Sequence, residues 1–207
     1  VRDTVLAALP RSRRARVHAR AAAVFDGRRD HETETALHWL AAGPRYVGSA
    51  WRACLAAADA ALRVHAHDEA AGLLEQALDA QGSDGESEDR DRFELLVLLA
   101  DVRRRSGDWV HLRETTHAAL DLAQRLDDTE LLVRAGILTS TGALWASPQH
   151  GDIDEVLVSA LRDLLDRLPP GDDPRRCRVM LALANEIYYG AQPAEREHRV
   201  LGAGIQE

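Results

Sequence analysis

The 207-residue sequence predicts an all-α fold in which helices pair as antiparallel hairpins. Apolar residues recur at spacings of three and four, which places them along one face of a helix. No segment alternates apolar and polar residues over the length of a strand. Glycine, proline and aspartate fall between the apolar runs, where helices are expected to end and begin.

Residues 91–127 show this pattern most clearly. One apolar stripe consists of Phe93, Leu96, Val97 and Ala100, and a second of Leu112, Thr116, Ala119, Leu120 and Ala123. Between the stripes, Gly107 suits the left-handed end of a helix, and Asp108 suits the N-cap of the next helix. Two helices joined by such a short turn fold back on one another. Each then needs a further neighbour to bury its second face.

The same pattern recurs upstream at a spacing of 42 residues. Aligning His65 with Gly107 pairs Ala58 with Ala100, Ala70 with Leu112, Leu74 with Thr116, Ala77 with Ala119 and Leu78 with Leu120. The pattern resembles a degenerate tetratricopeptide repeat, with the residues Gly-Asp-Trp at 107–109 as the turn. Such repeats are about 34 residues long, and the polar loop at 81–90 accounts for the excess. The resemblance implies a tetratricopeptide-like α-solenoid of stacked hairpins, and we expect the loop 81–90 to be its most flexible internal segment.

The remaining helix boundaries are predicted from caps. A helix is expected over 128–145, and Asp152 with Glu155 has the spacing of a capping box before the next helix. Asp173 followed by Pro174 predicts the start of another helix, with an N-cap and then proline at the first helical position. Counting the partial helices expected at the two ends, the sequence predicts about eleven helices.

Composition excludes several classes of function. All 26 basic residues are arginine, so the chain has neither the lysine of a P-loop nor an amine for Schiff-base chemistry. Residues 1–29 carry a balance of +6 and residues 30–207 a balance of −14. The acidic body argues against binding of a nucleic-acid backbone by this region. The arginines at 11–16 are interpreted as a solvated helix face, with nucleic-acid contact as the alternative.

Histidines and carboxylates do not predict a metal site or an active site. His65 and His67 lie at an expected turn, but no third ligand follows at helical spacing. The acids within 84–89 alternate as in a calcium loop, yet the required glycine and closing glutamate are missing. Motifs such as Gly-x-Ser-x-Gly and His-Glu-x-x-His do not occur. We therefore expect no catalytic residues, no cofactor and no bound metal.

The cellular setting is inferred from cysteines and hydropathy. Cys54 and Cys177 both lie in helical patterns, and each is expected to be a buried thiol in a reducing compartment. No signal peptide and no transmembrane run is recognisable, so we expect a soluble, cytoplasmic protein without a membrane partner. The chain begins at Val1 inside an amphipathic pattern, and we expect it to be a piece of a longer protein.

The order of segments resembles a known family of bacterial regulators. The stretches VRDTVLAALPRSRRARVHARAAAVF, ALHWLAAG, AWRACLAAADAAL and HDEAAGLLEQAL are similar to MalT-like and large LuxR-type signal-transduction ATPases. In that family a nucleotide-binding module leads through a winged-helix-like segment into a tetratricopeptide-like array. The resemblance implies that residues 1–27 end the winged-helix-like segment and that residues 28–207 form the helical repeat domain. It therefore implies the sensor or scaffold portion of a transcriptional regulator.

We expect this region to bind a protein or peptide partner, such as another domain of its parent chain, or a small-molecule effector, and to relay binding to an ATPase module. One alternative is a helical-bundle enzyme or small-ligand-binding domain, motivated by nine histidines and many acids. Another is a DNA-contacting fragment, motivated by the basic N-terminal residues.

Five charged residues are candidates for partner binding. In stacked hairpins the first helix of each pair lines the concave surface. The repeat alignment places Asp59 with Asp101 and Arg63 with Arg105, and Arg104 lies beside them. These residues are predicted to form a charged ladder that recognises a partner. The alternative is that each aspartate pairs with the arginine four residues later on its own helix.

Overall fold

The computed structural model describes residues 9–84, 89–141 and 153–190. These residues form nine α-helices and one short 3-10 helix, and they contain no strand, which confirms the all-α prediction for them. The elements are α2 (Arg11–Phe25), α3 (Glu32–Ala42), η1 (Pro44–Tyr46), α4 (Val47–Arg63), α5 (His67–Gln81), α6 (Asp89–Ser106), α7 (Trp109–Arg125), α8 (Thr129–Gly136), α9 (Glu155–Arg167) and α10 (Pro174–Gly190). The helices expected at the two ends of the chain and the tip of the loop 81–90 lie outside the described residues.

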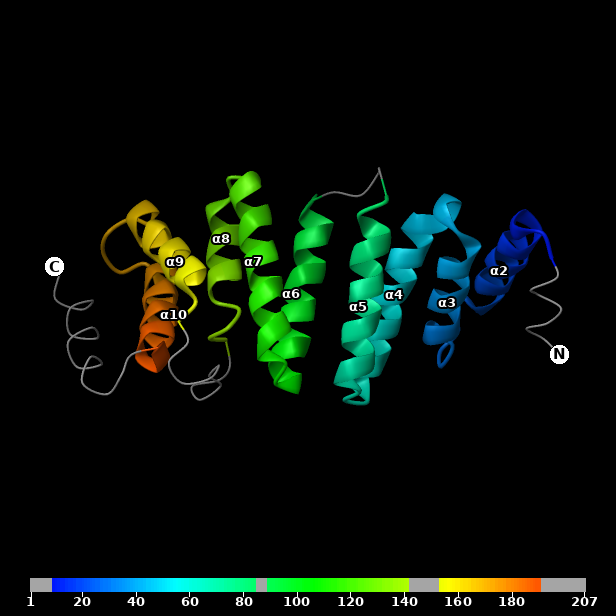
Figure 1. Cartoon of the computed structure of the whole chain (residues 1–207), viewed down its shortest axis with the longest axis horizontal. Coiled ribbons are helices and arrows are strands. Elements are labelled where there is room, and N and C mark those ends of the chain that lie inside the picture. Colours follow the sequence, from blue (N-terminus) through cyan, green and yellow to red (C-terminus); the bar gives the residue numbers. More distant parts are fainter. Residues whose placement is uncertain (1–8, 85–88, 142–152, 191–207) are drawn as a thin grey trace. The chain divides into compact units, whose positions relative to one another are not determined.

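Contacts divide the chain into two compact units, residues 1–102 and 103–207, with the boundary inside α6. In the first unit α2 packs on α3, α3 on α4 and α4 on α5 (Figure 1). In the second unit α7 packs on α8, α8 on α9 and α9 on α10 (Figure 1). Within each unit, helices thus contact their neighbours in sequence, as stacked hairpins do.

Small side chains allow the helices of the first unit to approach closely. The buried face of α4 consists of Ala50, Trp51, Cys54, Ala57, Ala58 and Ala61, and α5 contributes Ala70, Leu73, Leu74, Ala77, Leu78 and Gln81.

The two apolar stripes predicted within residues 91–127 lie on α6 and α7. All of their residues are buried except Val97, which is half-buried. Each buried leucine stabilises the fold by about 1.5–3 kcal/mol relative to an exposed one.

Three helix ends share one main-chain geometry. His65, Gly107 and Asp127 have positive φ angles of 60°, 77° and 49°. After each of them, the next main-chain N–H donates to the carbonyl five residues earlier, at 3.0, 2.9 and 3.3 Å respectively. This is the hydrogen bond of a left-handed helix cap. The turns that the 42-residue alignment pairs therefore have the same conformation.

Two boundaries differ from the sequence prediction. α8 ends at Gly136 rather than near residue 145, because main-chain hydrogen bonds from Leu138 to Ala135 and from Ser140 to Ile137 tighten the chain into turns. Residues 142–152 of the expected helix lie outside the described part of the chain. The N-cap of α9 is Asp154, whose carboxylate accepts from the Leu157 N–H at 3.1 Å, and Asp152 is not described.

The start of α10 follows the prediction. The Asp173 carboxylate accepts from the Arg175 N–H at 2.8 Å and from its guanidinium at 2.6 Å. These hydrogen bonds from Arg175 lower the pKa of Asp173 to about 2.

The expectation of buried cysteines holds only for Cys54, since Cys177 is exposed in the first turn of α10. Burial raises the pKa of the Cys54 thiol to about 11. Among the described helices, none combines the length and apolar character that crossing a membrane requires.

Candidate functional site

A cavity of about 470 Å³ lies in the first unit between the α2–α3 loop, α3 and α4. Sites for small molecules commonly enclose about 300–1,000 Å³, so this cavity is large enough for a ligand. α2 ends at Phe25, and Gly27, with φ of 74°, lies in the loop that carries Arg28 and Arg29 to the cavity wall. α3 contributes Trp39 to the wall, and α4 contributes Arg52.

Basic side chains outnumber acidic ones around this cavity. Three arginines line it, together with Asp26 and Glu32. Glu32 is also an ion-pair partner of Arg63, with its Oε1 lying 3.5 Å from an Arg63 guanidinium nitrogen. The charge of Glu32 is thus partly neutralised from outside the cavity. The cavity therefore favours negatively charged ligands over positively charged ones.

Arg52 is held in position by its own helix. Its Nη1 donates to the Gly48 carbonyl at 2.8 Å, and its guanidinium carbon lies 4.4 Å from the centre of the Trp51 ring, a cation–π contact. A Cβ on Gly48 would lie 3.0 Å from that same nitrogen, so a glycine at this position leaves room for the guanidinium. Trp51 is in turn fixed, because its Nε1 donates to the Asp84 carboxylate at 2.9 Å.

Aromatic surface borders the cavity at Trp39. Its ring lies 5.4 Å from that of Tyr46, centre to centre, and the two rings are tilted by 38°. Trp39 is half-buried and lines the cavity. The sequence contained no signal for this role, because the cavity depends on how α3 crosses α4.

The structure places the predicted partner-binding residues on two helices. On α4, Asp59 and Arg63 are exposed and form an ion pair with each other, as the alternative reading expected. On α6, Asp101 and Arg104 are half-buried and Arg105 is exposed. All three of the α6 residues take part in polar interactions. Through Glu32, Arg63 also contacts the wall of the cavity.

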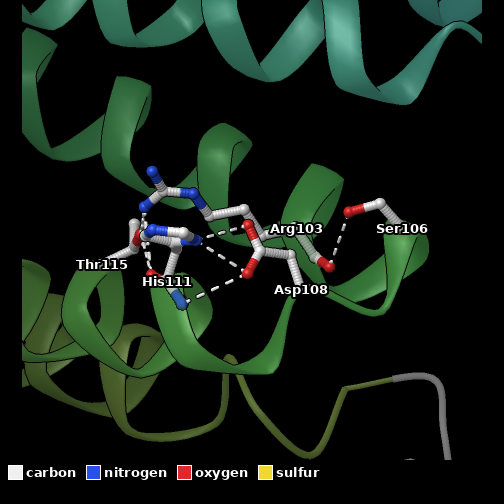
Figure 2. Close-up of polar contacts among 5 residues, drawn as sticks. All are labelled: Arg103, Ser106, Asp108, His111 and Thr115. Atoms are coloured by element: carbon white, nitrogen blue, oxygen red, sulfur yellow. Dashed lines mark hydrogen bonds and ion pairs between the residues drawn. The ribbon is translucent and has the colours of Figure 1, made fainter.

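Arg103, which was not among the predicted site residues, is a buried side chain at the α6–α7 turn (Figure 2). Its Nη1 donates to the His111 carbonyl at 3.0 Å and to Thr115 Oγ1. The Asp108 carboxylate lies 2.8 Å from His111 Nδ1 and caps α7 (Figure 2). Arg103 follows Ala100 at helical spacing, so the buried stripe itself was the signal for its burial. These contacts fix the last turn of α6, which also carries Arg104 and Arg105.

A second polar cluster joins α7, α9 and α10. His117 Nε2 lies 2.7 Å from the buried Asp154 carboxylate, and the Asp154 N–H donates to Glu186 Oε1 at 3.0 Å. Arg113 Nε lies 3.5 Å from the same carboxylate. The adjoining cavity has a volume of about 20 Å³, enough for about one water molecule. The geometry therefore anchors the start of α9 and leaves no room for a substrate.

The histidines of the α4–α5 turn are not grouped with other possible metal ligands in the part of the chain that the structure describes. The rings of His65 and His67 are 6.2 Å apart, centre to centre. Across residues 9–84, 89–141 and 153–190, no three histidine, cysteine, aspartate or glutamate side chains are grouped so that they could hold a metal ion.

The protein is all-helical in its described residues, and within each unit the helices pack on the helices next to them in the chain. Comparisons of the chain with protein-family models, curated proteins and solved structures found no match.

Proposed function

We propose that this chain is a non-catalytic helical-repeat scaffold that binds a partner or an effector. In this proposal it is the tetratricopeptide-like sensor region of a bacterial transcriptional regulator, and it relays binding to an ATPase module. The partner is a protein or peptide, including other domains of the same parent chain, or a small-molecule effector.

The observation that carries the proposal is the repeated turn. His65 and Gly107 are 42 residues apart, and both have a positive φ angle. After each of them, the next main-chain N–H donates to the carbonyl five residues earlier. Each turn joins a helix pair, α4 with α5 and α6 with α7. Repeated hairpins of this kind present extended surfaces that suit binding. The resemblance of sequence segments within residues 1–127 to large LuxR-type regulators, described above, is a second argument for this assignment.

The test measures binding between this region and the remainder of its parent regulator. Reversing both Arg104 and Arg105 to glutamate is expected to weaken binding at least tenfold, because two attractive charges become repulsive. The matched control reverses Arg162 and Arg178, which are exposed on α9 and α10. Helical melting curves of both variants should stay close to that of the wild type. Normal binding by the Arg104/Arg105 variant would contradict the predicted partner surface.

The alternative, a small-ligand-binding or enzymatic domain, is favoured by the 470 Å³ cavity. A metal assay after dialysis and a screen for hydrolytic turnover separate a catalytic domain from a binding scaffold. Stoichiometric metal or turnover that depends on Asp26 or Glu32 would support the enzyme. Binding without turnover would support the scaffold.

A further inference from the structure

We propose that the cavity between α3 and α4 binds a small molecule in which a planar ring carries a carboxylate or phosphate group. This inference rests on the proposed function and names the chemical class of its effector. It follows from three properties of the cavity, namely its charge, its positioned guanidinium and its aromatic wall.

The charge of the cavity comes from arginines that have not been neutralised. Within the described residues, Arg28 and Arg29 have no acidic partner at ion-pair distance, whereas Glu32 is engaged by Arg63 at 3.5 Å. Asp26 is the remaining acid in the wall. The planar fork of a guanidinium matches the two oxygens of a carboxylate or phosphate. A cation would face repulsion from the same arginines.

Arg52 adds a donor whose position is fixed before any ligand arrives. The Gly48 carbonyl takes one of its N–H groups at 2.8 Å, and the Trp51 ring supports the guanidinium at 4.4 Å. A side chain that is already ordered loses less conformational freedom on binding than a flexible one. Arg52 therefore offers a positioned contact to the anionic group, and Arg28 and Arg29 line the same cavity.

The aromatic wall accounts for the ring of the ligand. Trp39 borders the cavity, and the small side chains of Ala53 and Ala56 add apolar surface to its wall. Stacking on an indole and burial of apolar area both stabilise the binding of a planar ring. With about 470 Å³ of space, the cavity has room for a ring together with its charged group.

The experiment is calorimetric titration of the whole chain with two planar anions and their neutral counterparts. Indole-3-acetate is compared with indole-3-acetamide, and adenosine monophosphate with adenosine. We expect one anion to bind with 1:1 stoichiometry and a Kd below about 1 mM, and at least tenfold more tightly than its neutral counterpart. The tighter of the two anions identifies the charged group as carboxylate or phosphate.

Variants locate the binding. Arg52→Gln, and the double change Arg28→Gln with Arg29→Gln, should each weaken the anion about tenfold or more. The matched controls are Arg20→Gln and Arg45→Gln, exposed arginines of the same unit that do not line the cavity. Equal binding of anion and neutral counterpart, no saturable binding of either anion, or full binding by the cavity variants would each overturn the inference.

The outcomes for the cavity and for the proposed function are distinguishable. A chain that binds the rest of its regulator normally but neither anion overturns the ligand class and leaves the scaffold function standing. A chain that binds an anion in the cavity and also turns it over overturns the non-catalytic function.

Discussion

Two neighbouring threonines on α7 allow the contribution of the Arg103 anchor to be measured. Thr115 and Thr116 are 2% and 0% exposed, so replacing either with valine removes a hydroxyl from an equally buried place. Each hydroxyl donates to the carbonyl four residues earlier, at 2.7 and 2.9 Å. Only Thr115 also accepts a hydrogen bond from a guanidinium, that of Arg103.

The magnitude follows from this difference. Loss of the bond to the helix carbonyl is common to both variants, and we expect Thr116→Val to change the free energy of unfolding by less than about 1 kcal/mol. Thr115→Val in addition removes one acceptor of the buried Arg103 guanidinium, whose Nη1 keeps its hydrogen bond to the His111 carbonyl, and a hydrogen bond to a charged group is worth about 1.5–3 kcal/mol. With a urea m-value of roughly 1–3 kcal/mol/M, Thr115→Val should lower the unfolding midpoint by about 1 M relative to Thr116→Val.

The assay is urea unfolding followed by far-UV circular dichroism. Arg103→Met, alone and combined with Thr115→Val, completes a double-mutant cycle, and we expect the two changes together to cost clearly less than the sum of each alone. If Thr115→Val and Thr116→Val lower the midpoint equally, or if the cycle is additive, the hydrogen bond from Arg103 does not stabilise this turn.

Three further predictions follow from local geometry. An alkylating reagent at neutral pH should modify the exposed Cys177 quickly and Cys54 only on unfolding, since burial raises the pKa of that thiol to about 11; equal rates would contradict this. The pKa of Asp173 is lowered from 3.8 to about 2, so its contribution to stability is present above pH 4 and is lost as the pH falls towards 2. The melting temperature of Asp173→Asn should therefore depend less on pH over that range. Identical pH dependence of melting in the two proteins would show that the Asp173 carboxylate does not stabilise the start of α10. Because position 65 has φ of 60°, His65→Gly should raise stability by up to about 1 kcal/mol, whereas Gly107→Ala should lower it by about 1 kcal/mol; a fall in melting temperature for His65→Gly would count against this account.

Features that depend on a few adjacent residues were predictable from the sequence. Gly107 ends α6 and Asp108 caps α7, as expected, because a positive φ and a capping carboxylate are local requirements. The buried stripes were likewise predictable, since the helical period alone selects them. Asp173 with Pro174 marked the start of α10 correctly for the same reason.

The candidate site was not predictable, because it depends on contacts between residues that are distant in the sequence. The cavity joins the α2–α3 loop to Arg52, and no spacing rule relates them. The α9 cap, Asp154, likewise contacts His117 of α7, which is 37 residues away in the sequence. The predicted pairing of Asp59 with Arg63 is seen, whereas their role in partner binding stays a prediction.

The left-handed turns have an evolutionary consequence. Their defining hydrogen bonds run between main-chain atoms, so these bonds do not depend on particular side chains. A residue that tolerates positive φ is sufficient, and histidine, glycine and aspartate each meet that need here. Substitutions can therefore accumulate at the turns while the hairpins persist. In a protein built this way, the backbone fold can be retained after the sequence has diverged.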